Sequence, residues 1–182
     1  NLGNFQWSKS IGGSSYTFGS SITTDALGNV LLIGNFQGTT DFDPGAAVQN
    51  FTVPAGEISR EFIAKYDPSG NFVWVKPFYG GTTGFFYLRA IQTDAAGNIY
   101  TTGEFCTDVD FGPGAPVYNL LGGQVCGMFV SKLDASGSFV WARGVENMVG
   151  FEAKDIAVDA SGSSYVAGFF MGTMDFDPGA NI

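Results

Sequence analysis

Three copies of a short acidic loop contain the residues of this sequence that are best suited to chemistry. The loop reads Asp-Phe-Asp-Pro-Gly at 41–45 and 175–179, and Asp-Phe-Gly-Pro-Gly at 110–114. Two carboxylates placed two positions apart in such a loop can converge on one hard cation. Calcium accepts about six to eight oxygen ligands in irregular geometry, so it suits this loop better than magnesium does. The candidate calcium ligands are Asp41, Asp43, Asp110, Asp175 and Asp177.

The alternative to calcium binding is a structural role for the same aspartates, since two carboxylates are few for a strong calcium site. Asp41 and Asp43 can accept hydrogen bonds from nearby backbone amides in an Asx-type turn that Pro44 and Gly45 close. In the second copy, Gly112 replaces the second carboxylate, although Asp108 is near enough in sequence to substitute for it. Both interpretations, calcium binding and turn formation, stay open at this point.

The acidic loops belong to a repeat of about 67 residues. Trp7, Trp74 and Trp141 occur at this spacing, and we place the repeats at 1–70, 71–137 and 138–182. A long fixed period indicates one supersecondary unit used several times, and each unit must bury its apolar face against a neighbour. The chain is therefore expected to form a single repeat array.

The pattern within each repeat predicts four β-strands. Apolar and polar residues alternate over 5–11, whereas 30–36 is apolar on both faces and must be covered on both sides. Short turns headed by aspartate join successive strands into antiparallel sheets, and a glycine-rich link crosses to the next sheet. We predict four-stranded blades at 16–78 and 86–145, a partial blade at 151–182, and an N-terminal strand at 5–11 that would complete the last blade of a closed ring.

Two whole blades cannot close a ring. A β-propeller needs at least about four blades, so this chain is expected to form an incomplete ring. Its expected partners are further repeats of the same polypeptide, giving about six or seven blades, or other copies of the chain. The chain begins at Asn1 rather than Met, which also indicates a mature or excised piece of a larger protein.

Composition favours an all-β protein and excludes several functions. The 182 residues are 45% hydrophobic and 15% aromatic with 27 glycines, and they contain no run long enough to span a membrane. A net charge of −9 and scattered basic residues argue against nucleic acid as a partner. The absence of histidine removes Ser-His and Cys-His nucleophile pairs and any histidine-ligated zinc site.

The remaining acidic residues give no sign of a catalytic centre. Five aspartates recur at turns and are expected to form those turns: Asp25, Asp67, Asp94, Asp134 and Asp159. Three glutamates occur outside the repeat pattern with no visible partner: Glu104, Glu146 and Glu152. Glycoside cleavage would require a pair of carboxyl groups about 5–9 Å apart, and the sequence indicates none. We expect no catalytic residues.

Aromatic residues divide into two groups. Those that recur in every repeat are expected to fill the space between blades: Trp7, Trp74 and Trp141, and Phe36, Phe105 and Phe170. Those outside the pattern are candidates to reach a propeller face and stack on sugar rings: Phe78, Tyr79, Phe85 and Phe86.

Cys106 and Cys126 both lie in the second repeat, where one strand enters a long loop and the next strand begins. Antiparallel pairing of those strands would bring the two thiols together. A bridge across about 20 residues would stabilise the fold by roughly 3 kcal/mol and would indicate an oxidising compartment. The alternative is two unrelated buried thiols.

Three stretches resemble the SBBP-type β-propeller repeats of secreted and cell-surface bacterial proteins. They are Thr93–Gly103, Phe-Ile-Ala-Lys-Tyr-Asp-Pro-Ser-Gly at 62–70, and Phe-Val-Ser-Lys-Leu-Asp-Ala-Ser-Gly at 129–137. The resemblance covers essentially the whole chain and implies a β-propeller-type array. It implies no catalytic residues, because the family is defined by its scaffold.

The expected function is that of a non-enzymatic structural or interaction module at the cell surface or outside the cell, with calcium as its candidate stabilising ion. The alternative is a carbohydrate-binding propeller with a lectin-like role. The expected ligands are accordingly an extracellular protein or a glycan.

Overall fold

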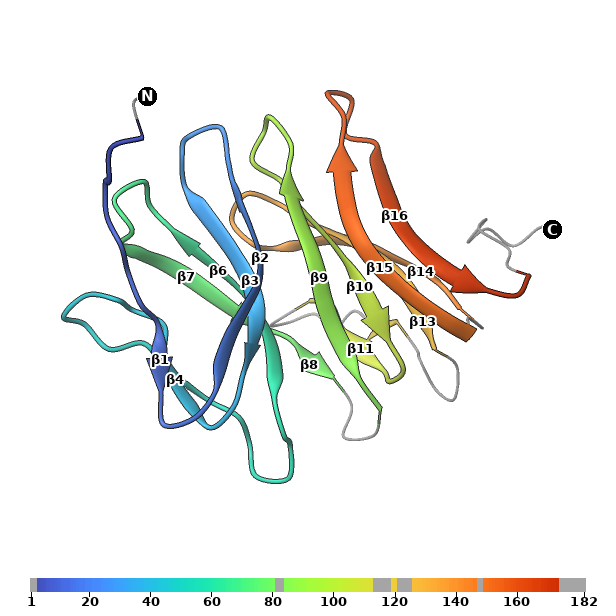
Figure 1. The fold of residues 1–182 in the computed structure, drawn as a ribbon, viewed down its shortest axis with the longest axis horizontal. Helices are drawn as coiled ribbons and strands as arrows, with labels where there is room; N and C mark the ends of the chain where they lie inside the picture. Colours follow the sequence, from blue (N-terminus) through green and yellow to red (C-terminus); the bar gives the residue numbers. More distant parts are fainter. Residues whose placement is uncertain (1–2, 81–83, 113–118, 121–125, 147–148, 174–182) are drawn as a thin grey trace.

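The computed structural model describes residues 3–80, 84–112, 119–120, 126–146 and 149–173. Within these ranges the chain is all-β, as predicted, and no segment forms a helix that could cross a membrane. Two four-stranded antiparallel sheets and one two-stranded sheet follow one another along the molecule (Figure 1). We call them sheet 1, sheet 2 and strand pair 3.

The strands of each sheet follow the expected order. Sheet 1 contains β2 (Thr17–Thr24), β3 (Val30–Phe36), β6 (Arg60–Tyr66) and β7 (Phe72–Pro77). Sheet 2 contains β9 (Phe86–Thr93), β10 (Ile99–Phe105), β13 (Gly127–Leu133) and β14 (Phe139–Val145). Strand pair 3 contains β15 (Val149–Val158) and β16 (Ser164–Met171). The first strands of the three sheets, β2, β9 and β15, lie next to one another (Figure 1), and we call them the inner strands.

Two small sheets support the acidic loops. One joins β1 (Gly12–Gly13), β4 (Thr39–Asp41) and β5 (Asn50–Thr52). The other joins β8 (Tyr79–Gly80), β11 (Val109–Asp110) and β12 (Asn119–Leu120). The strand that precedes each large sheet pairs with the strand that leads into an acidic loop. Thus β1, before sheet 1, pairs with β4, and β8, before sheet 2, pairs with β11.

Aspartates form the tight turns, as the sequence predicts. Asp25 Oδ1 accepts hydrogen bonds from the amides of Leu27 and Asn29, at 3.0 and 2.9 Å. The same pattern recurs at Asp67, Asp94, Asp134 and Asp159. These carboxylates satisfy the backbone amides of the turns, which explains their recurrence without any catalytic role.

Glycine is required in the second strand of each sheet by a close backbone approach. A Cβ atom at Gly34, Gly103 or Gly168 would collide with a carbonyl oxygen of the neighbouring inner strand. Each inner strand carries a β-bulge at this level. These repeated glycines therefore mark a bulge that brings two backbones together.

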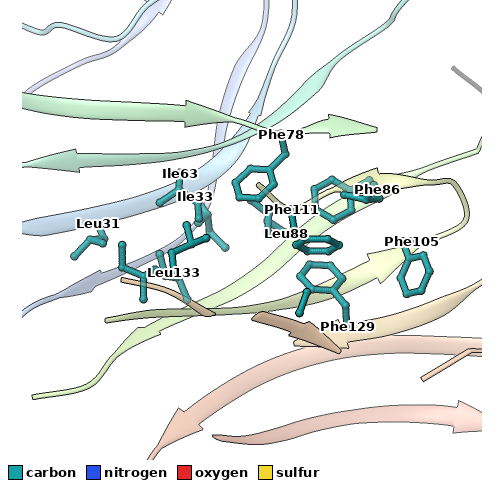
Figure 2. Packing of buried hydrophobic residues seen from close by; sticks show 14 residues of the cluster. Leu31, Ile33, Ile63, Phe78, Phe86, Leu88, Phe105, Phe111, Phe129 and Leu133 are labelled. Atoms are coloured by element: carbon teal, nitrogen blue, oxygen red, sulfur yellow. The ribbon is translucent and has the colours of Figure 1, made fainter. Parts of the chain in front are cut away.

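The main hydrophobic core lies between sheets 1 and 2. It joins Leu31, Ile33 and Ile63 of sheet 1 to aromatic residues of the following repeat (Figure 2). The Phe111 ring lies 6.2 Å from Phe78, 5.7 Å from Phe86 and 4.8 Å from Phe129. Phe36 and Phe105 are buried as predicted, whereas Phe170 is 40% exposed.

Two of the proposed sugar-stacking aromatics are buried in this core. Phe78 and Phe86 are only 1% and 9% exposed, so the assignment of these two residues to a binding face is wrong. Both rings pack against Phe111 in the core between sheets 1 and 2. Phe85 does reach the surface, and the side chain of Tyr79 lies outside the described part of the structure.

The N-terminal strand at 5–11 was predicted to complete the last blade of a closed ring, and this stays a prediction. Among the described residues, 5–11 pairs with no strand. The Trp7 indole instead packs against Gly70 and donates a hydrogen bond to the Pro68 carbonyl at 3.0 Å. Trp74 of β7 packs against Gly137 of sheet 2 in the same way. Residues 5–11 therefore contact sheet 1 as β7 contacts sheet 2.

Candidate binding face at the inner strands

Two stacked pairs of aromatic side chains stand exposed at the start of the inner strands. Tyr16 and Phe18 stack with ring centroids 6.2 Å apart, and Phe85 and Tyr87 stack at 5.3 Å. Their exposed fractions lie between 37% and 54%. The pairs occupy equivalent positions, because Phe18 lies opposite Asn35 in sheet 1 as Tyr87 lies opposite Glu104 in sheet 2. We call these four residues the aromatic face.

Arg89 adds a positive charge to the aromatic face. It is the bulged residue of β9, and its guanidinium carbon lies 4.8 Å from the centroid of the Tyr87 ring. Its Nε and Nη2 atoms lie 3.0 and 2.9 Å from Oε2 of Glu104. The ion pair fixes the guanidinium beside the Tyr87 ring, while about a third of the arginine side chain stays exposed.

Buried glutamates connect the sheets behind the aromatic face. Glu61 Oε2 of sheet 1 accepts a hydrogen bond from the Leu88 amide of sheet 2 at 3.2 Å. Glu104 Oε1 of sheet 2 accepts one from the Ala153 amide of strand pair 3 at 2.9 Å. Leu88 and Ala153 both stand immediately before a bulged residue.

Sequence reasoning missed this connection. The two glutamates occupy different strands of their sheets, and no periodic signal links Glu61 to Glu104. Glu104 had no visible sequence partner, yet it contacts both Arg89 and Ala153. The only signal in the sequence is that Glu104 is acidic, whereas the equivalent residues of the other two repeats are Asn35 and Phe169.

Burial changes the ionisation of Glu61. Its side chain is enclosed by sheet 1 and the start of β9, and the loss of solvation raises its pKa to about 8. The hydrogen bonds from Leu88 and Asn35 and the charge of Arg89 act in the opposite direction, but they do not outweigh burial. At neutral pH the carboxyl group is therefore mostly protonated and can donate a hydrogen bond.

A groove of about 270 Å³ opens beside Glu61. Phe85 and Tyr87 line one side, and the Glu57–Arg60 ion pair lines the other. The two arginine nitrogens Nε and Nη2 lie 2.6 and 2.7 Å from the Glu57 carboxylate oxygens, so this pair is bidentate. The groove offers aromatic rings together with fixed hydrogen-bonding groups, a combination suited to binding.

The acidic loops use their carboxylates in turns. Asp41 Oδ1 accepts hydrogen bonds from the amides of Asp43 and Gln49, at 3.0 and 2.8 Å. Asp43 Oδ1 accepts one from Gly45 at 2.7 Å, and Asp110 Oδ1 accepts one from Gly112 at 2.9 Å.

The described residues contain no cluster of three or more acidic, histidine or cysteine side chains that could hold a metal ion. Asp175 and Asp177 lie outside the described residues. Calcium binding at these loops remains a prediction.

The predicted disulfide between Cys106 and Cys126 is present, with the two Cα atoms 4.1 Å apart. The Cys106 amide donates a hydrogen bond to the Phe85 carbonyl at 2.8 Å. The bridge therefore restrains the backbone that presents one aromatic pair.

Comparison with known proteins gives two results. A family described as a beta-propeller repeat, SBBP, matches residues 6–43. An uncharacterized WD repeat-containing protein of Acanthamoeba polyphaga mimivirus is 28% identical over 149 residues, which cover 76% of this chain. The match spans only 11% of that relative's own length.

Proposed function

Since the chain contains a β-propeller repeat of the SBBP family, we propose that it is a non-catalytic interaction module that binds its partner through the aromatic face. Similarity to a WD repeat-containing protein supports an interaction role in general terms. We place the module outside the cell or at the cell surface, because its disulfide is stable in an oxidising compartment.

The observation that carries this proposal is the exposure of Tyr16, Phe18, Phe85 and Tyr87 at equivalent positions of two repeats. Other aromatics that recur in the first two repeats, such as Phe36 and Phe105, are buried in the core. Tyrosine and arginine are enriched among the residues that contribute most to interfaces, and Arg89 lies directly beside Tyr87. A flat aromatic surface with one fixed cation is suited to a protein partner.

Carbohydrate binding is the second candidate, and the groove beside Glu61 favours it. Exposed aromatic rings present flat apolar surfaces to the C–H faces of sugars. The protonated carboxyl group of Glu61 and the Glu57–Arg60 pair supply hydrogen-bonding groups at the side of the groove. These features are present together only at the Phe85–Tyr87 pair among the described residues.

A paired binding experiment separates the two functions. The wild-type chain and a Phe85→Ser, Tyr87→Ser variant would be applied to a glycan array and to an array of purified extracellular proteins. A variant with Leu27→Ser and Val48→Ser serves as the control, because these residues are 81% and 63% exposed and lie outside both the aromatic face and the groove beside Glu61.

Reproducible binding to proteins that only the aromatic variant loses would support the interaction module. Binding to glycans with the same loss would support the lectin-like role instead. Equal binding by all three proteins would refute the assignment of the aromatic face.

A further inference from the structure

Among the described residues, no strand pairs with the outer edge of β16, whereas the equivalent strands of the other two sheets are paired on both edges. In sheet 1, β3 pairs with β2 on one side and β6 on the other, and in sheet 2, β10 pairs with β9 and β13. Among the described residues, β16 pairs only with β15. The two complete sheets therefore show what kind of strand fits this edge.

The first feature of the missing strand is a phenylalanine opposite the repeated glycine. Gly34 lies opposite Phe62, and Gly103 lies opposite Phe129. The Phe129 ring lies over Gly103, with its Cε1 atom 3.0 Å from where a Cβ would stand. Gly168 occupies this position in β16, because it pairs with Ala153 as Gly103 pairs with Leu88.

A groove is present where that phenylalanine would lie. It has a volume of about 450 Å³ and lies between the β13–β14 face of sheet 2 and β16. Its lining includes Thr102 and Val130 from sheet 2, and Val166, Gly168 and Phe170 from β16. A ring placed over Gly168 would enter this groove, on the same face of the strand that Phe129 occupies in sheet 2.

The second feature is a lysine on the opposite face, three residues beyond the phenylalanine. Lys65 lies opposite Leu31, and Lys132 lies opposite Tyr100. Lys65 Nζ is 3.0 Å from Asp25 Oδ2 in the nearby turn. Lys65 thus reaches the aspartate that forms the turn between the first two strands of its sheet.

Lys132 makes the equivalent contact in sheet 2, with the turn aspartate Asp94. Its Nζ atom is 3.7 Å from Asp94 Oδ2 and 4.7 Å from the centroid of the Tyr100 ring. The Tyr100 hydroxyl donates a hydrogen bond to the same carboxylate oxygen at 3.2 Å. An ammonium group is therefore held by a carboxylate and a tyrosine ring together.

Strand pair 3 contains the equivalent aspartate and tyrosine, but neither of its two strands supplies the equivalent lysine. The Tyr165 hydroxyl lies 3.2 Å from Asp159 Oδ2, as in the Tyr100–Asp94 pair. Tyr165 is 61% exposed, whereas Tyr100 is fully buried. Hydrogen bonds from the Ser161 hydroxyl and the Ser163 amide hold the pKa of Asp159 below its usual range, so the carboxylate is charged at neutral pH.

We propose that the β16 edge binds an extended strand with the pattern Phe-x-x-Lys, whose phenylalanine lies over Gly168 and whose lysine reaches Asp159 and Tyr165. The occupant is the third strand of a further β-propeller repeat, added by β-augmentation. A folded second copy is a poor donor, because its own β6 and β13 are paired on both edges. The proposal does not depend on the function of the aromatic face.

The test uses a synthetic peptide with the sequence of residues 127–145, which carries Phe129 and Lys132 and the strand that follows. The fluorescently labelled peptide would be titrated with the 182-residue chain, and binding would be followed by anisotropy. We expect saturable binding that protects the amides of β16 from hydrogen exchange. Light scattering on the chain alone would report self-association.

Substitutions test the predicted register. Phe129→Ala in the peptide should weaken binding by about a hundredfold, because it empties the groove over Gly168. Lys132→Gln should weaken binding by roughly tenfold, because it removes one ion pair and one cation–π contact. The control peptide Ser131→Ala should bind with unchanged affinity.

A double-mutant cycle assigns the lysine to its acceptor. Asp159→Asn in the chain should weaken binding of the unmodified peptide but not of the Lys132→Gln peptide. Asp134→Asn is the matched control, because Asp134 forms the same serine-bonded turn without contacting the proposed strand.

No peptide binding, or equal binding by all the peptides, would overturn the proposal. So would self-association of the chain that protects β16, because a second copy would then be the occupant.

Discussion

Replacing Glu61 with glutamine should remove a loss of stability that the wild-type protein suffers between about pH 5 and pH 8. Glu61 is buried between sheet 1 and sheet 2 and is only 5% exposed. Burial raises its pKa from 4.5 to about 8, although the Leu88 amide, Arg89 and Asn35 favour the charged form. Glutamine can keep the hydrogen bond from Leu88 without ever becoming charged.

The sign and size of the effect follow from proton linkage. Between the two pKa values the folded state binds more protons than the unfolded state, so the free energy of unfolding falls as the pH rises. The full stability is present below about pH 4.5, and the loss is complete above about pH 8. Each unit of pKa shift corresponds to about 1.4 kcal/mol, so the loss across this window is on the order of 4–5 kcal/mol.

Urea denaturation at closely spaced pH values would measure this loss for both proteins. The wild type should lose up to about 1.4 kcal/mol per pH unit across the window, and Glu61→Gln should be nearly flat over the same range. Glu57→Gln is the control. The Arg60 hydrogen bond lowers the pKa of Glu57, so that residue titrates below the window and its removal should leave the slope unchanged.

Equal slopes for the wild type and Glu61→Gln between pH 5 and pH 8 would contradict this prediction. Such a result would mean that Glu61 is ionised in the folded protein, with Arg89 and the Leu88 amide offsetting the cost of burial.

Two further predictions concern the disulfide and the acidic loops. Reduction of the Cys106–Cys126 bridge should lower the free energy of unfolding by roughly 3 kcal/mol, measured by urea denaturation with and without reductant; a Cys106→Ala, Cys126→Ala variant that is insensitive to reductant provides the control, and equal stability in both states would contradict the prediction. If the acidic loops bind calcium, a chelator should lower the melting temperature of the wild type, since a cation that binds only the folded state stabilises it. Asp41→Asn with Asp43→Asn should reduce that sensitivity, whereas identical melting curves with and without chelator would leave only the turn-forming role.

Local features of the fold were predictable because neighbouring residues produce them. The turn aspartates, such as Asp25 and Asp159, bond to amides only two and four residues away. The glycines at 34, 103 and 168 mark a close approach between adjacent strands joined by a short turn. The cysteine pair was predictable because both residues lie at facing ends of neighbouring strands.

The candidate binding face was only partly predictable. Phe85 was identified as an aromatic outside the repeat pattern, but Phe78 and Phe86 share that property and are buried. Phe78 and Phe86 are buried because Phe111, from a loop distant in the sequence, packs against both rings. Tyr16 and Phe18 gave no separate signal, because the sequence does not indicate which aromatic residues of a strand the neighbouring sheet leaves uncovered.

The all-β class, the 67-residue repeat and the tight turns were predictable from the sequence alone, because strand periodicity and turn chemistry act over a few residues. The contacts between successive sheets were not, because they join residues far apart in the chain. Glu61 meets the Leu88 amide across 27 residues, and Glu104 meets the Ala153 amide across 49. Residues 5–11 have the alternation of a strand but pair with no strand among the described residues. A strand requires a neighbour to accept its backbone hydrogen bonds, and periodicity within one segment carries no information about that neighbour.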